Sequence, residues 1–144
     1  MTRPVTPQIT ADIIIEMPLI DDNPIILIER KFEPNGWAIP GGFVDVGETI
    51  ASAARREALE ETTLEVELDV LLGIYSDPER DSRGHTVCAV FLGNASGKPV
   101  AADDAKDIAL FDPFNVDVEL AFDHRQILQD YCDYRRDGTI KLPI

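Results

Sequence analysis

Apolar and polar positions alternate in two rhythms along this chain, one typical of strands and one typical of helices. Short apolar runs bounded by turn residues predict strands over 11–17, 25–31, 37–40, 65–76, 85–92 and 106–112. The turn sequence Asp21-Asp22-Asn23-Pro24 separates the first two runs and predicts a hairpin. Apolar residues three and four apart predict helices over 49–62 and 119–136.

One face of the predicted helix over 49–62 combines small residues with glutamates. At about 100° per residue, its apolar members are Ile50, Ala53, Ala54 and Ala58. Glu57, Glu60 and Glu61 lie on or beside the same face. Neighbouring carboxylates repel each other, and removing them from water is costly unless a cation compensates them. The face is therefore either a cation site or a solvated acidic surface, which is common in a chain with 27 acidic residues.

Two kinds of cation could compensate these glutamates. Arg56 can pair with a neighbouring carboxylate, either Glu48 or Glu60. Oxygen ligands favour Mg²⁺ or Mn²⁺, and the sequence lacks the His/Cys cluster that suits zinc. Gly41 and Gly42, just before the helix, favour the cation site because they let the backbone approach a ligand closely.

The segment 42–64 resembles the Nudix box. That pattern is a glycine, five residues, a glutamate, seven residues, Arg-Glu, an aliphatic residue, any residue, Glu-Glu, any residue, a glycine and an aliphatic residue. The positions in register are Gly42, Glu48, Arg56, Glu57, Glu60, Glu61 and Leu64. Ala58 is a small version of the aliphatic residue, and Thr63 replaces the second glycine. Because a β-branched residue resists the left-handed conformation that glycine can take there, we expect Thr63 to alter how the helix ends.

The resemblance implies a role for each residue of the box. The implied metal ligands are the carboxylates of Glu57, Glu60 and Glu61 and the backbone carbonyl of Gly41. Glu48 and Arg56 would orient and neutralise these glutamates. In Nudix hydrolases the bound cation is Mg²⁺ or Mn²⁺, which offsets phosphate charge and lowers the pKa of bound water.

The resemblance also implies the reaction, in which water attacks one phosphorus of the pyrophosphate in a nucleoside diphosphate linked to another moiety. Glu60 is one candidate for the base that accepts the proton of this water. In some family members the base comes from a later loop. The candidates of that kind in this chain are Asp103, Asp104 and Asp107.

The fold that the resemblance implies is α/β, of the α+β type: the Nudix fold, a mixed β-sheet sandwiched between α-helices. The predicted order of strands around two helices agrees with it. The chain has 144 residues and no internal repeat or linker, so we expect a single domain over 1–144. Residues 1–8, which contain Pro4 and Pro7, are expected to form a loose N-terminus.

The segment 75–86 bears on the substrate, because it resembles a loop of small ADP-ribose pyrophosphatases. In those enzymes a proline about this far past the box accompanies a preference for ADP-ribose, and Pro78 follows Leu64 by 14 residues. Arg80 and Arg83 offer forked donors suited to phosphates, and His85 could bind a ribose or a phosphate. The alternative is a polar turn with solvated charges.

Aromatic and basic residues also precede the box. Arg30 and Trp37 flank an Asn35-Gly36 turn near the predicted metal site, so they are candidate substrate-binding residues. Trp37 could stack on a nucleobase or pack in the core. For His124, in the last predicted helix, we expect capping or a core hydrogen bond in preference to catalysis.

Composition limits the partners of the protein. A net charge of −14 argues against nucleic-acid backbones and anionic membranes. No apolar stretch reaches the roughly 18 residues of a membrane span, and the amino terminus lacks a signal-peptide core. Cys88 and Cys132 are expected to be buried thiols, which agrees with a cytoplasmic location. The resemblance implies a homodimer and a small-molecule nucleotide substrate.

Three functions follow from these observations. We favour a metal-dependent ADP-ribose pyrophosphatase that yields AMP and ribose 5-phosphate. The second is a nucleoside triphosphate pyrophosphatase acting on oxidised dGTP or a related nucleotide. The third is a non-catalytic nucleotide-sensing domain, against which the complete set of box glutamates argues.

Overall fold

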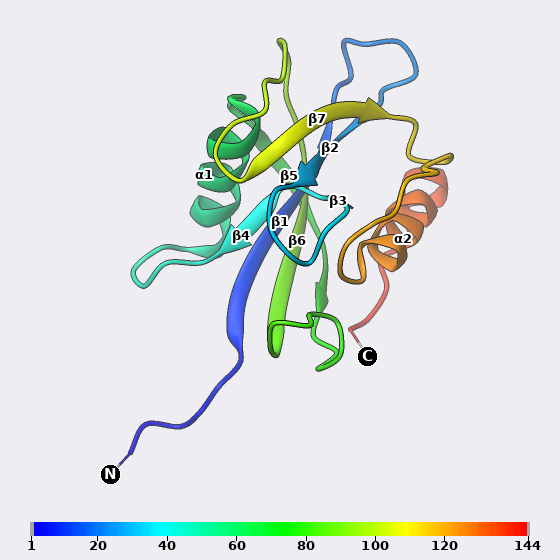
Figure 1. Cartoon of the computed structure of the whole chain (residues 1–144). Helices are drawn as coiled ribbons and strands as arrows, with labels where there is room; N and C mark the ends of the chain where they lie inside the picture. The colour runs from blue at the N-terminus through cyan, green and yellow to red at the C-terminus, as the bar shows by residue number, and fades with distance from the viewer. Residues whose placement is uncertain (1, 144) are drawn as a thin grey trace.

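The computed structural model describes residues 2–143, in which seven strands and two helices follow one another (Figure 1). They are β1 (Gln8–Glu16), β2 (Ile25–Arg30), β3 (Trp37–Ala38), β4 (Gly41–Phe43), α1 (Ile50–Thr62), β5 (Glu67–Tyr75), β6 (Thr86–Asn94), β7 (Ala105–Phe111) and α2 (His124–Asp137). Each predicted strand and helix is confirmed with shifted ends, and β4 is a strand that the sequence pattern missed. Met1 and Ile144, the two ends of the predicted domain, lie outside the described residues.

β1 organises the sheet because both of its edges are paired. One edge runs parallel to β6 from the pair Gln8↔Thr86 to the pair Glu16↔Asn94. Gln8 was expected in the loose N-terminus, but it is the first residue of β1. The other edge of β1 pairs antiparallel with β4 over residues 10–12. β5 extends the sheet beyond β6, and β2 pairs with β3 and β7. These pairs are antiparallel, so with the parallel pair of β1 and β6 the sheet is mixed.

The predicted hairpin between the first two strands is present at a single residue pair. β1 and β2 pair only at Glu16↔Ile25. Along the rest of β1, the segment before β4 takes the place of β2, and the Ile13 N–H donates to the Pro40 carbonyl at 2.9 Å. The splitting of β1 and β2 is what places Gly41 and Gly42 beside β1.

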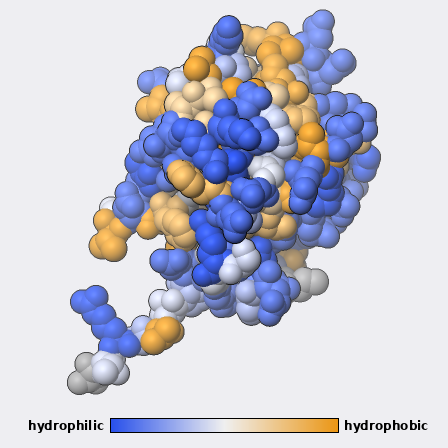
Figure 2. Space-filling model, in the orientation of Figure 1, coloured by the Kyte–Doolittle hydropathy of each residue, from blue (hydrophilic) through white to orange (hydrophobic). Residues whose placement is uncertain are grey.

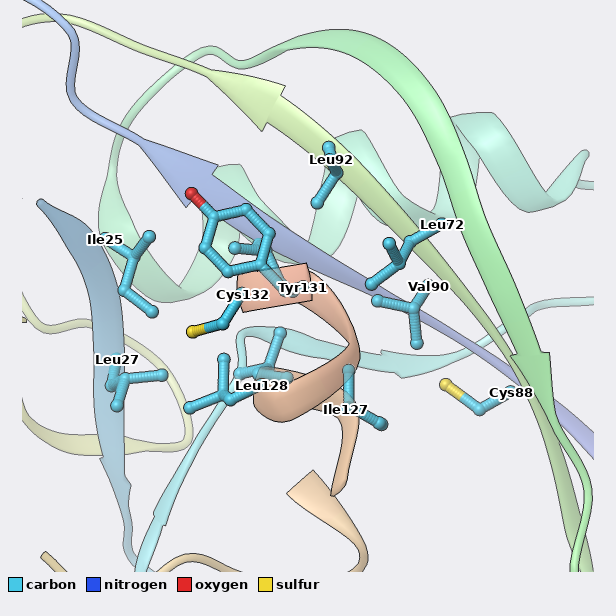
Figure 3. Close-up of a cluster of buried hydrophobic side chains, with 12 residues drawn as sticks. Ile25, Leu27, Leu72, Cys88, Val90, Leu92, Ile127, Leu128, Tyr131 and Cys132 are labelled. Carbon is cyan, nitrogen blue, oxygen red and sulfur yellow. The ribbon is translucent and has the colours of Figure 1, made fainter. Parts of the chain in front are cut away.

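The two helices cover opposite faces of the sheet (Figure 1). Side chains alternate along β1, so Ile13 and Ile15 pack in the core on the α1 side while Ile14 packs on the α2 side. Figure 3 shows the α2 side, where Leu128 and Tyr131 of α2 meet side chains of β2, β5 and β6. A mixed sheet between helices confirms the predicted fold class. Cys88 and Cys132 are both free and lie in the core on the α2 side, as expected.

The last helix begins at His124 and not at residue 119 as predicted. Residues before it pair with β3 instead: the Trp37 N–H donates to the Glu119 carbonyl at 2.9 Å, and the Ala121 N–H donates to the Trp37 carbonyl at 2.8 Å. The sequence pattern could not reveal this, because Leu120 and Ile127 have the i, i+7 spacing of a helix face.

The start of α1 agrees with the prediction to within one residue. The side chain of Thr49 caps the helix by accepting a hydrogen bond from the Ser52 N–H at 3.0 Å. Ala53 and Ala58 are fully buried against the sheet. Ile50 is exposed, so its predicted place on the core-facing stripe is wrong, and the stripe begins one turn later.

The end of α1 overturns the expectation about Thr63. This residue has φ 64° and ψ 7°, the left-handed conformation of a glycine cap, and its N–H donates to the Leu59 carbonyl at 2.9 Å. The helix therefore ends as it would with glycine. The cost is backbone strain of about 1–2 kcal/mol, because Cβ approaches the following carbonyl oxygen in this conformation.

Replacing Thr63 by glycine should stabilise the protein. Relief of strain exceeds the extra entropy that glycine loses on folding, so we expect the free energy of unfolding to rise by about 0.5–1 kcal/mol. Urea denaturation measures the change. The matched control is Gly138, the left-handed cap of α2, where an added Cβ meets nothing within 4 Å; Gly138→Ala should destabilise the protein by a similar amount. A Thr63→Gly protein that is less stable than wild type would contradict the strain argument.

Hydrophilic side chains cover much of the face seen in Figure 2, with hydrophobic side chains in separate groups between them. Within residues 2–143, no helix has the length and apolar character needed to cross a membrane.

Candidate active site

Glu61 lies where the end of α1 meets β4. It is 4% exposed, and its Oε1 accepts a hydrogen bond from the Gly41 N–H at 2.8 Å. Burial raises the pKa of this carboxyl to about 8, although the Gly41 hydrogen bond opposes the rise. Such a value marks a carboxylate that lacks a sufficient positive partner.

Glu57 lies one turn earlier on the same face of α1. Burial raises the pKa of its carboxyl despite a hydrogen bond from Arg56. A Cβ added to Gly42 would lie 2.5 Å from the Oε1 of Glu57, so the glycine leaves the space that this carboxylate fills. This contact explains why a residue without a side chain stands at this position.

Arg56 holds several box carboxylates together. Its Nε and Nη2 donate to Glu48 at 2.7 and 2.9 Å, and its Nη1 donates to Glu57 at 2.9 Å and to Glu60 at 3.2 Å. The Arg56 hydrogen bond is the main reason why the pKa of Glu48 falls to about 2. The sequence left open whether Arg56 pairs with Glu48 or Glu60, and the structure pairs it with both.

Glu57 and Glu61 open into a cavity of about 290 Å³. The residues that line it are Thr10, Asp12, Arg30, Phe32, Glu33, Ile39, Gly41, Gly42, Phe43, Asp45, Glu57, Glu61, Arg80, Asp81, Arg83, Asp104, Phe122 and His124. We call it the carboxylate pocket. A larger cavity of about 590 Å³ lies between β5, α2 and residues 141–143, but it contains none of the box glutamates.

Arginines stacked on phenylalanines form another part of the pocket wall. The Arg83 guanidinium lies 5.0 Å from the ring centre of Phe43 and 5.1 Å from that of Phe122. The Arg30 guanidinium lies 4.9 Å from the Phe122 ring centre. Burial, followed by repulsion from Arg83, lowers the pKa of Arg30. Two arginines that repel each other in a partly buried wall form a surface suited to an anion.

Arg83 and Arg80, predicted as a pair, have different surroundings. Arg83 donates to Asp81 at 3.0 and 2.9 Å and keeps a side chain that is 38% exposed. Arg80 is buried, with Nε and Nη2 donating to Asp123 at 3.0 and 2.8 Å and Nη1 donating to Thr86 at 2.7 Å. Arg80 touches the pocket wall, but its guanidinium is mainly engaged in joining the loop before β6 to the start of α2.

Two other predicted substrate residues do not line the carboxylate pocket. Trp37 is half-buried and packs edge-on against Phe111, with ring centres 5.2 Å apart, on the α2 side of the core. This is the core-packing alternative. His85 is exposed, and its Nε2 lies 2.9 Å from the Ser76 carbonyl oxygen.

The three candidate bases from the later loop differ in their position relative to the pocket. Asp104 lines the pocket. Asp103 does not line it, although its charge contributes to the raised pKa of Glu57. Asp107 lies on β7 opposite Glu29 and accepts a hydrogen bond from the Ile108 N–H at 2.7 Å. Glu60 is outside the pocket wall with its carboxylate on Arg56.

Sequence reasoning missed part of the pocket. The missed lining residues with chemical interest are Asp12, Phe43, Asp81 and Phe122. His124 was expected to make a core hydrogen bond, and this is confirmed: its Nδ1 accepts from the Ile39 N–H at 3.0 Å. His124 also lines the carboxylate pocket, which the sequence did not indicate. A signal for Asp12 existed, since it is an acidic residue inside an apolar strand.

The donor set of the pocket fits a hard divalent cation. Glu57 and Glu61 supply oxygen ligands, and burial, with a smaller contribution from neighbouring carboxylates, raises the pKa of both groups. Among residues 2–143, no three His, Cys, Asp or Glu side chains converge as a ready-made ligand cluster. The carboxylates of Glu57 and Glu61 are instead held by Arg56 and by the Gly41 N–H.

Comparisons with known proteins show which family the chain is similar to. The NUDIX domain model matches residues 10–131. A curated relative, the ADP-ribose pyrophosphatase of Methanocaldococcus jannaschii, is 45% identical over 90% of this chain and 75% of its own length. The putative 8-oxo-dGTP diphosphatase of Bacillus subtilis is 36% identical over 64% of this chain and 58% of its own length.

A solved structure is similar over most of the fold. It is a bifunctional NMN adenylyltransferase/ADP ribose pyrophosphatase from Francisella tularensis, complexed with AMP and a Mn ion. It superposes with a TM-score of 0.75 and 29% identity over 89% of this chain, which spans 42% of that protein. The family model and the Methanocaldococcus relative both cover most of the sequence, and this chain therefore belongs to the NUDIX family of hydrolases.

Proposed function

We propose that this chain is a metal-dependent ADP-ribose pyrophosphatase, which hydrolyses ADP-ribose to AMP and ribose 5-phosphate. The observation that carries the proposal is the carboxylate pocket, where the half-buried Glu57, the buried Glu61 and arginines stacked on aromatic rings share one cavity. In ADP-ribose a pyrophosphate joins two ribose units. Its phosphate oxygens suit both a cation held by the glutamates and the arginines of the pocket. The 45% identity to an ADP-ribose pyrophosphatase supports the same substrate.

The box residues divide the work of holding a cation. Glu57 and Glu61 would be its main ligands, with Glu60 and the Gly41 carbonyl beside them. Arg56 and Glu48 fix the orientation of the helix carboxylates through the hydrogen bonds described above. Mg²⁺ or Mn²⁺ bound here would offset charge on the pyrophosphate oxygens and lower the pKa of bound water.

The arginines of the pocket wall are the proposed substrate contacts. Arg30 and Arg83 would bind phosphate oxygens, and Phe43 and Phe122 would hold the two guanidiniums in place. Asp104 is our preferred base for the attacking water among the later-loop candidates, because it lines the pocket. Asp103, Asp107 and Glu60 stay alternatives for this step.

A second candidate function is supported by the 36% identity to a putative 8-oxo-dGTP diphosphatase. The purified protein should therefore be assayed with Mg²⁺ on ADP-ribose and on 8-oxo-dGTP. We expect kcat/KM to be at least about a hundredfold higher for ADP-ribose, since remote contacts to a matching substrate are realised in the transition state. Release of pyrophosphate from the triphosphate with no AMP from ADP-ribose would favour the second function.

The predicted homodimer and the cytoplasmic location stay predictions. Light scattering on the purified protein measures the mass in solution, for which we expect twice the 16.0 kDa of one chain.

A further inference from the structure

Asp12 and His124 form a polar pair in the wall of the carboxylate pocket that the box does not include. Asp12 comes from β1 and His124 from the first residue of α2. Both are largely buried, with side chains 10% and 2% exposed. Neither residue belongs to the segment 42–64 that resembles the Nudix box.

The tautomer of His124 follows from its other contact. Its Nδ1 accepts a hydrogen bond from the Ile39 N–H, so Nδ1 carries no proton. The ring proton of the neutral imidazole therefore lies on Nε2. This nitrogen is a donor in the pocket wall.

The donor on Nε2 has no hydrogen-bond partner among residues 2–143. Asp12 Oδ2 lies 3.1 Å from Nε2, but the geometry does not make a hydrogen bond. Buried polar groups are almost always satisfied, so an unpartnered N–H in a pocket wall points to a ligand atom. An acceptor and a donor thus lie side by side, with neither satisfying the other.

A hydroxyl group matches this arrangement, because one oxygen can accept from Nε2–H and donate to the carboxylate. A phosphate oxygen does not match, since the Asp12 carboxylate would repel it. The position of Asp12 and His124 in the pocket also limits which part of the substrate can carry this hydroxyl. A Cβ added to Gly41 would clash with Asp12 Oδ1, and the Gly41 N–H binds Glu61. The pair therefore lies beside the proposed cation site. In a substrate whose pyrophosphate is bound by that cation, the group covalently attached next to the pyrophosphate is a ribose.

We infer that Asp12 and His124 together bind a ribose hydroxyl of the substrate and so select ribose conjugates over their deoxy analogues. This inference rests on the proposed function. It assigns His124 a direct contact with substrate in addition to its hydrogen bond to Ile39.

Two variants of His124 separate these contacts. In His124→Asn the amide oxygen can replace Nδ1 and keep the Ile39 hydrogen bond, whereas the donor at Nε2 is lost. In His124→Gln the longer amide can replace Nε2–H, whereas the buried Ile39 N–H loses its acceptor. A merely structural role would make His124→Gln the more damaging variant for every substrate.

The test measures kcat/KM on ADP-ribose and on two deoxy analogues, one lacking a hydroxyl on each ribose. We expect wild type to disfavour one analogue by about ten- to a hundredfold. His124→Asn should lose this preference through a lower kcat/KM on ADP-ribose and on the analogue that keeps the contacted hydroxyl, with kcat/KM on the disfavoured analogue unchanged. His124→Gln should keep part of the preference despite a lower melting temperature. Wild type that treats both analogues like ADP-ribose would overturn the inference, as would His124→Asn losing activity equally on all three.

Failure of the proposed function would look different. Wild type would then yield no AMP from ADP-ribose, and the same variants would be compared on GTP and dGTP. A ribose preference that His124→Asn removes would support the hydroxyl contact with that substrate class. Equal use of GTP and dGTP by wild type would overturn it.

Discussion

Glu61→Gln should abolish turnover while making the metal-free protein more stable. The amide oxygen of glutamine can still accept the Gly41 hydrogen bond, so we expect the fold to persist. The charged ligand for a divalent cation is lost, and kcat should fall by at least about a thousandfold. Residual activity is measured as AMP released from ADP-ribose under saturating Mg²⁺.

The stability half of this prediction depends on pH. Burial raises the pKa of Glu61 from 4.5 to about 8, so the folded state binds its proton more tightly than the unfolded state does. The metal-free wild type should therefore lose stability as pH rises from about 4.5 to about 8. Glutamine has no charge to gain, so the variant should match wild type near pH 5 and exceed it at pH 8, by about 2 kcal/mol or more.

Glu65→Gln is the matched control, because it makes the same substitution at an exposed glutamate just after α1. It should leave both turnover and the pH profile of unfolding unchanged. Urea denaturation in EDTA at the two pH values gives the stabilities. An inactive Glu61→Gln that is less stable than wild type at pH 8 would show that Glu61 supports the fold and not a cation.

Arg80→Met should destabilise the fold strongly. The guanidinium is buried and makes two hydrogen bonds to Asp123, the residue before α2, so its loss leaves that carboxylate without a counter-charge. Removing one partner of a buried ion pair costs about 3–5 kcal/mol. Because the Asp123 side chain is 23% exposed, we expect the lower end, about 3 kcal/mol, and a melting temperature lower by about 10 °C.

Two comparisons make this result specific. Arg80→Met combined with Asp123→Leu removes both charges and should recover part of the lost stability, which a double-mutant cycle measures. Arg30→Met removes an arginine whose Nε donates to the neutral Pro34 carbonyl, so the loss of stability should be smaller. Because Arg30 is a proposed phosphate contact, this substitution should also raise KM. If Arg80→Met unfolded like wild type and only raised KM, Arg80 would be the phosphate-binding residue that the sequence first indicated.

The box could be predicted from the sequence because its residues interact within one short segment. Glu57, Glu60 and Glu61 lie on one helix, so their spacing alone predicts that they share a face and need a cation. Arg56 is on the same helix and within reach of them. The family resemblance then supplied the reaction and the fold, a mixed sheet between helices, and the order of periodic segments agreed with that fold.

The rest of the pocket depends on contacts between distant segments. Arg80 and Arg83 look alike in sequence, but the partner of Arg80 is 43 residues away, and nothing local indicates it. His124 lies 85 residues from Ile39, whose N–H fixes its tautomer. The expectation about Thr63 was wrong for another reason. Threonine disfavours a left-handed cap, but the end of α1 holds it in that conformation nevertheless.

The central claim is that the glutamate face of α1 is a cation-dependent hydrolytic site. The most direct measurement is ADP-ribose turnover by wild type before chelation, after EDTA, and after Mg²⁺ is restored, with Glu61→Gln assayed beside it. We predict that AMP formation stops on chelation, returns with Mg²⁺, and is absent from the variant under all three conditions. Turnover that survives EDTA, or a variant as active as wild type, would contradict the claim.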